Sequence, residues 1–317
     1  MAVNTNAPPA ASSAGGDPST RRRAKPIAGR RQTRAAWLFM APSLVVLAVF
    51  VVYPMTQALY LSFTEYDVLT PAEWVGLANY RELLTDEAFL RALRNTLYYA
   101  AVTTPVSVIL ALGTAVLLNR RFPLRGLGRT AVFLPVVVGL AVVAIAWSFL
   151  LDPDIGLLSY WLRGLGITSD QGWLRDPDLA MPAVMLVGIW KNFGFYMVIY
   201  LAGLQSIPRN LYEAAKLDGA RGWGQFRNVT WPLLANQTLL VLVLCAIATL
   251  QAFDQIYVMT RGGPFFRTET LVMVIYRLGF REFRFGYAAA ISWVLVLLIL
   301  VLSLAQLMYF RRRAVEL

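Results

Sequence analysis

The chain has 317 residues, of which 58% are hydrophobic and only 15% charged, and its mean hydropathy is +0.56. Soluble domains are about 45–50% apolar and about 25% charged, so the composition argues against an ordinary soluble fold. The absence of histidine and the single cysteine, Cys245, exclude His-based catalysis, the usual zinc and haem sites and an intrachain disulfide framework. The net charge of +11 fits either nucleic-acid binding or a membrane protein with basic cytoplasmic loops, so the distribution of charge has to decide.

The first 34 residues form a tail rich in Ala, Pro, Ser and Gly that ends in a cluster of arginines. Such a segment cannot bury a core and is expected to be a disordered, basic cytoplasmic tail. The apolar run that follows Arg34 is too long for the hydrophobic region of a signal peptide. We therefore expect the first span to be an uncleaved anchor.

Six stretches of the chain are long and apolar enough to cross a hydrocarbon core about 30 Å thick. Five of them carry no charged residue, and the fourth in chain order is interrupted only by Lys191. Several contain prolines, which a membrane helix tolerates where neighbouring helices or water satisfy the freed backbone groups. We expect an all-α integral membrane domain over residues 35–310, followed by a basic cytoplasmic tail over 311–317. Its spans are predicted at about 37–63, 96–118, 130–151, 179–204, 233–253 and 287–310.

The charges between the spans predict the orientation, because cytoplasmic loops are rich in Lys and Arg. The two tails and the loops 119–129 and 205–232 hold 18 basic and 4 acidic residues, whereas the other three loops hold 10 basic and 14 acidic residues. Both termini are therefore predicted to be cytoplasmic. One external loop, 254–284, departs from the rule, since it has five arginines and three acids.

The predicted cytoplasmic loop 205–232 contains the sequence expected of a short helix. Pro208 breaks the preceding span, Asn210 is a candidate N-cap with Glu213 three residues later, and Gly219 is suited to end the helix. Ala214 and Ala215 leave a smooth face that a second protein can approach closely. The alternative is an amphipathic helix that lies on lipid.

This loop resembles the EAA loop of the permease subunits of binding-protein-dependent ABC importers. The resemblance implies the type I importer permease fold (MetI/MalF-like) with a coupling helix, here within 211–222, that docks on an ATP-hydrolysing subunit. The matching positions predicted to couple to the ATPase are Glu213, Ala214, Ala215, Asp218, Gly219 and Ala220.

Other motifs resemble the carbohydrate branch of the family, the MalF-like and UgpA-like subunits. They are Trp74-Val75-Gly76-Leu77, Asn79-Tyr80, Asn95-Thr96-Leu97, Trp190-Lys191, Gln205-Ser206-Ile207-Pro208 and Thr260-Arg261-Gly262-Gly263-Pro264. The resemblance implies a bacterial inner-membrane permease for a carbohydrate or a similar solute, with alternating access as its mechanism. It further implies a heterodimer with a second homologous permease, two ATP-binding subunits and an extracytoplasmic solute-binding protein facing Gly262, Gly263 and Pro264. We expect lipids but no nucleic acid as partners, and no cofactor or metal in this chain, with ATP and Mg²⁺ held by the ATP-binding subunits.

Lys191 is the clearest candidate for the path of a polar solute, because a charge near the centre of a span should face a cavity or a partner. The spacing i, i+3, i+4, i+7 places Gly188, Lys191, Asn192 and Phe195 on one face. By the resemblance, Cys245, Thr249 and Ala252 lie on the equivalent face of the fifth span, with Asp254 at its external end. Two roles remain open for Lys191, an ion pair with Asp254 or a contact with an anionic solute such as a glycerophosphodiester or glycerol phosphate.

The chain itself is not expected to hydrolyse ATP. A phosphate-binding loop needs Gly-Lys-Ser/Thr, but the chain's lysines are Lys25, Lys191 and Lys216, and none follows a glycine. An ion-driven secondary transporter is the alternative from another class, although the paired broken repeats of such proteins are not evident. A membrane enzyme is less favoured, since Lys191 is the one ionisable Asp, Glu, Lys or Arg within the predicted spans.

Overall fold

The computed structural model describes residues 30–120, 123–166 and 172–311 and is mostly α-helical. The predicted tails therefore lie largely outside the described residues. The chain divides into two units, residues 1–55 and 56–317. A short antiparallel pair of strands, β1 (Thr64–Glu65) and β2 (Glu73–Trp74), belongs to the second unit.

The first apolar helix begins as α1 (Arg30–Leu47), widens into a π-helical turn at Ala48–Val52 and continues as α2 (Tyr53–Leu61). It starts at Arg30, five residues before the expected start of the membrane domain at residue 35. Its segment Ala36–Leu61 is long and apolar enough to cross a membrane. Trp37, Phe39 and Phe50 are among its exposed side chains, which suits a helix whose surroundings are lipid or another subunit.

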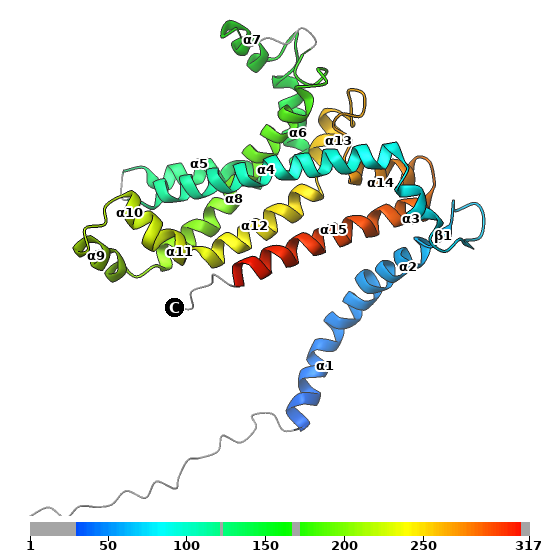
Figure 1. Cartoon of the computed structure of the whole chain (residues 1–317), viewed down its shortest axis with the longest axis horizontal. Helices are drawn as coiled ribbons and strands as arrows, with labels where there is room; N and C mark the ends of the chain where they lie inside the picture. Colours follow the sequence, from blue (N-terminus) through cyan, green and yellow to red (C-terminus); the bar gives the residue numbers. More distant parts are fainter. Residues whose placement is uncertain (1–29, 121–122, 167–171, 312–317) are drawn as a thin grey trace, which may run out of the picture. The chain divides into compact units, whose positions relative to one another are not determined.

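Four long helices form the body of the second unit: α4 (Glu87–Asn119), α8 (Ala180–Ser206), α12 (Ala235–Leu250) and α15 (Phe285–Arg311). They run alongside one another, with α4 against α8 and α12, and α12 against α15 (Figure 1). Asp86 accepts a hydrogen bond from the amide of Ala88 at 2.9 Å and so caps α4. The four helices cover the predicted spans 96–118, 179–204, 233–253 and 287–310, although α12 ends at Leu250 and α13 (Asp254–Met259) continues the apolar segment.

The third predicted span, 130–151, is not one continuous helix. It is divided into α5 (Arg125–Val137) and α6 (Leu140–Leu150), which meet at an angle of 99°. Val138 and Gly139 between them have extended backbone, and Pro135 inside α5 lacks the amide that would continue the helical bonding. The described part of the chain thus has five helices able to cross a membrane, or six if the bent pair counts as one span.

Shorter elements gather at the two ends of this body. At one end lie α9 (Arg209–Leu217), α10 (Trp223–Gln225), a π-helical turn η2 (Phe226–Thr230) and α11 (Trp231–Leu233). At the other end are the β1 and β2 pair, α3 (Ala78–Leu83) and α14 (Leu271–Phe280), while α7 (Leu157–Gly164) follows α6 (Figure 1). The C-terminal end of α15 lies at the same end as α9 (Figure 1). The predicted cytoplasmic loop 205–232 and the predicted external loops 65–94 and 254–284 therefore lie at opposite ends of the body (Figure 1).

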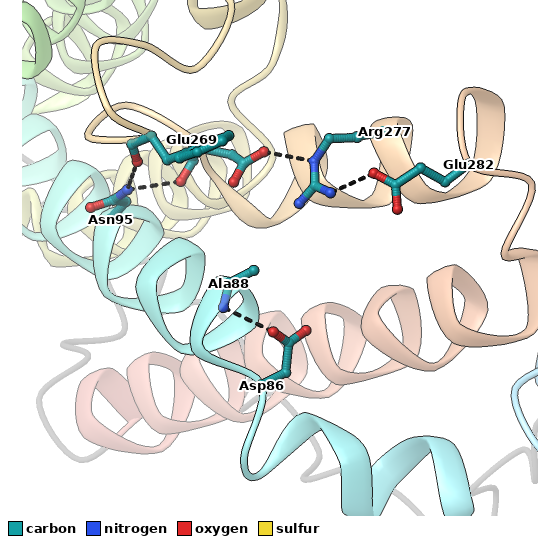
Figure 2. A network of polar contacts seen from close by, with 7 residues as sticks. Asp86, Ala88, Asn95, Glu269, Arg277 and Glu282 are labelled. Atoms are coloured by element: carbon teal, nitrogen blue, oxygen red, sulfur yellow. Dashed lines mark hydrogen bonds and ion pairs between the residues drawn. The ribbon is translucent and has the colours of Figure 1, made fainter.

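Two asparagines of the sequence motifs hold connecting segments in place by hydrogen bonds to backbone carbonyl oxygens. Asn79 is buried and donates to the carbonyl oxygens of Ser62 and Thr64 at 3.0 and 2.9 Å. Asn95 donates to the carbonyl oxygens of Phe266 and Glu269 at 3.0 and 2.9 Å, as Figure 2 shows for the loop that precedes α14. These amides fix the connections at the end of the body opposite α9, because they satisfy backbone groups of segments remote in sequence.

Candidate functional site

A polar cavity of about 340 Å³ lies between the long helices of the second unit. Its walls come from α4, α8, α12 and the turn leading into α13, with the first residue of α6 at one side. The lining residues are Tyr99, Thr103, Ser107, Leu140, Gly188, Asn192, Tyr196, Cys245, Ala248, Thr249, Gln251, Ala252, Phe253, Asp254 and Gln255.

Six of the eight residues expected on the solute path line this cavity: Gly188, Asn192, Cys245, Thr249, Ala252 and Asp254. Lys191 and Phe195 are not among the lining residues. The cavity face of α8 follows the spacing i, i+4, i+8 through Tyr196, so the two positions at i+3 and i+7 lie to one side of it.

Lys191 binds the backbone at the bend of the third span. Its ammonium group donates to the carbonyl oxygen of Val136, 3.1 Å away in the last turn of α5. None of the ion pairs among the described residues involves Lys191, so the suggested pair with Asp254 is wrong. The physical reason is local, since the end of α5 leaves carbonyl oxygens without a helical partner and Lys191 satisfies one of them.

A face of α4 also lines the cavity and was not among the predicted parts of the solute path. Tyr99, Thr103 and Ser107 recur every four residues, a spacing that places them on one side of a helix and that would have predicted this polar face. The hydroxyl of Tyr99 accepts a hydrogen bond from the side-chain amide of Gln255 at 2.8 Å. Both side chains are buried, so this bond fixes the position of α4 against α13.

Two buried polar atoms at the cavity have no partner within the described structure. They are the hydroxyl oxygen of Thr103 and the side-chain carbonyl oxygen of Gln255. A buried polar group without a hydrogen bond costs about 1–3 kcal/mol, so such atoms favour occupation of the cavity by water or a polar solute. The described lining contains hydroxyl and amide groups, one carboxylate, Asp254, and no Lys or Arg.

A second candidate site is α9, whose bounds differ from the predicted coupling helix 211–222. The helix runs from Arg209 to Leu217, and Pro208, with extended backbone, stands at its N-cap in place of Asn210. No side-chain cap forms there, so the predicted capping by Asn210 is wrong. The chain leaves the helix at Gly219, whose φ of +82° is a left-handed conformation that glycine adopts without strain.

The anchored side of α9 is hydrophobic and its opposite side is free. Leu211 and Tyr212 pack against a buried cluster of α4, α8 and α12, and the Tyr212 hydroxyl lies 3.0 Å from that of Thr230. On the free side, Ala214 is exposed and Leu217 is 89% exposed, an unusual position for a leucine on a short polar helix. Of the other predicted coupling residues, three are exposed, Glu213, Asp218 and Gly219, and two are half-buried, Ala215 and Ala220.

The turn at Gly262, Gly263 and Pro264 lies at the opposite end from α9. It is held by Thr268, whose hydroxyl donates to the carbonyl oxygen of Gly263 at 2.7 Å and lies 2.7 Å from the hydroxyl of Thr260. Gly262 has a φ of +86°, so a side chain there would be strained. Gly262 is buried and Gly263 and Pro264 are half-buried, so the turn has a fixed conformation and is only partly exposed.

Two of the five arginines in the loop 254–284 form ion pairs. Arg277 bridges Glu269 at 3.0 Å and Glu282 at 2.6 Å (Figure 2), and Arg284 pairs with Glu82 at 2.8 Å. Burial lowers the pKa of Arg277, but its hydrogen bonds and charge contacts with Glu282 and Glu269 outweigh burial and raise that pKa. Two of the five arginines of this predicted external loop are thus paired with carboxylates.

Comparison with known proteins identifies the family. A family profile described as the inner membrane component of binding-protein-dependent transport systems matches residues 87–315. The chain belongs to this family. The match runs from the start of α4 to beyond α15 and so includes both the cavity and α9.

Similar members of the family are transport permeases. The chain is 38% identical over 283 residues to the lactose transport system permease protein LacF of Rhizobium radiobacter, covering 87% of this chain and 94% of that protein. It is 37% identical over 279 residues, with the same coverage, to the sn-glycerol-3-phosphate transport system permease protein UgpA of Agrobacterium fabrum. A crystal structure of a bacterial alginate ABC transporter, in complex with an alginate-bound periplasmic protein, contains a chain that matches with a TM-score of 0.76 and 25% identity, over 89% of this chain and 96% of that chain.

These findings confirm the family and the MetI/MalF-like permease fold that the sequence motifs implied. The family match and the similarity to a chain of the alginate ABC transporter place this chain among ABC permeases and not among ion-driven secondary transporters. The chain is thus an inner-membrane permease of a binding-protein-dependent ABC importer.

Proposed function

We propose that this permease forms part of the path for a neutral carbohydrate in an ATP-driven importer. The observation that carries the proposal is the cavity between α4, α8 and α12, whose described lining offers hydroxyl and amide groups and no basic side chain. Polar groups of this kind exchange hydrogen bonds with the hydroxyl groups of a sugar. The unpartnered oxygens of Thr103 and Gln255 are two such groups.

The relatives named for lactose and for sn-glycerol-3-phosphate leave two solute classes to compare. A phosphate ester carries about −1.5 to −2 charges at neutral pH and is normally bound by Arg or Lys. Lys191, the one basic candidate in the spans, is bound to Val136 outside the cavity lining, and the carboxylate of Asp254 would repel an anion. The cavity therefore favours the neutral solute over glycerol phosphate or a glycerophosphodiester.

The importer would need subunits that this chain does not supply. We infer a second, similar permease that completes the path, two cytoplasmic ATP-binding subunits that hold ATP and Mg²⁺, and an extracytoplasmic solute-binding protein. The proposed contact for the binding protein is the turn at Gly262, Gly263 and Pro264. Its backbone is held by the hydrogen bonds of Thr268, and it lies at the end of the body opposite α9 (Figure 1).

In the proposed mechanism, α9 transmits the closure of the ATP-binding subunits to the spans. Ala214 and Leu217 would enter a cleft of the ATP-binding subunit, with the carboxylates of Glu213 and Asp218 near basic groups at its edge. Leu211 and Tyr212 couple α9 to the buried cluster of α4, α8 and α12, so that a movement of α9 reaches the helices that surround the cavity. We therefore propose that the end of the body that contains α9 and the C-terminal end of α15 faces the cytoplasm.

The test is uptake by the purified importer in proteoliposomes, with ATP inside and the solute-binding protein outside. Neutral mono- and disaccharides and glycerol 3-phosphate are offered as radiolabelled solutes at equal concentrations. We expect ATP-dependent and binding-protein-dependent uptake of a neutral sugar and none of glycerol 3-phosphate. Uptake of glycerol 3-phosphate alone would contradict the proposed solute class, and uptake without ATP would contradict the mechanism.

A further inference from the structure

A mostly apolar groove of about 890 Å³ lies at the α9 end of the second unit, separate from the polar cavity. One wall is the C-terminal half of α4, and the other is the segment from Gly222 to Trp231 that follows α9. The lining residues are Ile109, Leu112, Gly113, Val116, Arg120, Gly222, Trp223, Phe226, Arg227 and Trp231.

The chemistry of the groove is divided along its length. Ile109, Leu112 and Val116 give an apolar floor on α4, and α4 ends at Asn119, immediately before Arg120. Arg120 and Arg227 are exposed and form no ion pair among the described residues. No acidic residue is among those that line the groove. An apolar trough with two free guanidinium groups matches a molecule that is apolar at one end and anionic at the other.

Two tryptophans indicate the depth at which the groove lies in a bilayer. Trp223 and Trp231 are 73% and 45% exposed, and both line the groove near the end of a span. Exposed tryptophans at span ends are characteristic of the interface between headgroups and hydrocarbon. The arginines therefore lie at the depth of phosphate headgroups.

The length of the apolar floor distinguishes a lipid chain from a protein helix. At 1.5 Å per residue, the helix from Ile109 to Arg120 extends about 16 Å, which is about half of the roughly 30 Å hydrocarbon core. A spanning helix of another subunit would need contacts along the full thickness. A groove that covers one leaflet has the length of one acyl chain.

We propose that this groove binds an anionic phospholipid, with an acyl chain along Ile109, Leu112 and Val116 and the phosphate against Arg120 and Arg227. The proposal requires only that the chain spans a membrane, so it stands apart from the proposed solute. Because the groove joins α4 to the segment that follows α9, a bound lipid would brace the coupling segment against the spans. Each guanidinium near anionic lipid contributes about 1 kcal/mol, roughly a fivefold effect on binding.

The experiment places a fluorophore in the groove and asks which lipid reaches it. Ile109 is 68% exposed and Cys245 is buried, so a bimane on Ile109→Cys labels the groove selectively. The labelled importer is reconstituted with nitroxide-labelled phosphatidylglycerol or phosphatidylcholine at increasing mole fractions. We expect half-quenching by the anionic lipid at a mole fraction at least roughly fivefold lower than for the zwitterionic lipid.

Charge variants then locate the preference. R120Q together with R227Q should abolish the difference between the lipids, whereas R81Q together with R94Q, the matched removal of two exposed arginines at the opposite end, should leave it unchanged. Equal quenching by both lipids in the labelled, otherwise unaltered importer would overturn the proposal without recourse to the charge variants. Absence of quenching by either lipid would also overturn it, because another protein chain would then cover the groove.

Discussion

Gly188 and Gly194 of α8 are both closed to a larger side chain, but against different neighbours. A Cβ atom at Gly188 would lie 2.3 Å from the hydroxyl of Tyr99, and one at Gly194 would lie 2.2 Å from the backbone carbonyl oxygen of Val132. The first clash is with a side chain of the cavity, whereas the second is with the backbone of α5. The two substitutions therefore separate the cavity from the packing.

Gly188→Ala should reduce sugar uptake by about tenfold or more, because displacement of Tyr99 breaks its hydrogen bond with Gln255. Assembly with the other subunits should persist, and the loss of thermal stability should be smaller than in Gly194→Ala, because the Gly188 clash is with a side chain. Gly194→Ala should instead destabilise the complex by about 1–3 kcal/mol, since backbone cannot move aside as a side chain can. Uptake kinetics and a thermal-shift measurement on both variants decide this, and the reverse pattern would contradict the assigned positions.

Lys191 supports the bend between α5 and α6 through the carbonyl oxygen of Val136. Lys191→Met should lower the maximal uptake rate several-fold while leaving the KM for the sugar within about twofold, because the ammonium group does not reach the solute. Lys191→Arg, which keeps a donor, should restore part of the rate. A large rise in KM with an unchanged maximal rate would show that Lys191 contacts the solute after all.

At the scale of elements, the ion pair between Glu269 and Arg277 holds the loop before α14 in place. The side chain of Glu269 is 4% exposed and pairs with Arg277, whereas the pair between Glu82 and Arg284 is about half exposed on both sides. Replacing the carboxylate of Glu269 is costly, because the guanidinium of Arg277 is already partly removed from water and would lose this partner. The pair between Glu82 and Arg284 is screened by water.

Glu269→Gln should therefore destabilise the permease by about 1–3 kcal/mol and expose the loop 260–270 to protease. The matched variant Glu82→Gln should cost less than about 1 kcal/mol. Thermal unfolding and limited proteolysis of the two variants in the same detergent provide the comparison. Equal loss of stability in both would refute the distinction between the two pairs.

The free side of α9 carries the proposed coupling. Glu213→Ala should uncouple ATP hydrolysis from uptake while the complex still assembles, because its carboxylate is exposed and forms no ion pair among the described residues. Glu87→Ala is the control, since Glu87 is also an exposed carboxylate and lies in the first turn of α4, at the opposite end of the body. The ratio of solute imported to ATP hydrolysed is the measurement, and a ratio unaffected in Glu213→Ala would remove this residue from the coupling.

Across the whole molecule, the sequence predicted what depends on composition and helical period. The spans at α4, α8, α12 and α15 follow from long apolar runs. Helical spacing grouped Gly188 with Asn192, and the family resemblance assigned their face to the solute path; both residues line the cavity. The bend at Val138 and Gly139 could not be predicted, because hydropathy records how apolar a segment is and not its direction. Lys191 was misassigned for a related reason, since its partner is a backbone carbonyl freed by that bend.

The central claim is that α9 contacts an ATP-binding subunit on the cytoplasmic side, and cross-linking from Ala214→Cys tests it most directly. Because Cys245 is buried, the new thiol is the reactive one, and Leu165→Cys, at an exposed residue after α7, serves as the externally placed control. The account predicts that a benzophenone maleimide attached to Ala214→Cys forms a photo-adduct with the ATP-binding subunit by insertion into a C–H bond. It also predicts labelling of Leu165→Cys alone by an impermeant maleimide added to intact cells. Labelling of Ala214→Cys from outside, or an assembled complex in which it forms no adduct with the ATP-binding subunit, would contradict the account.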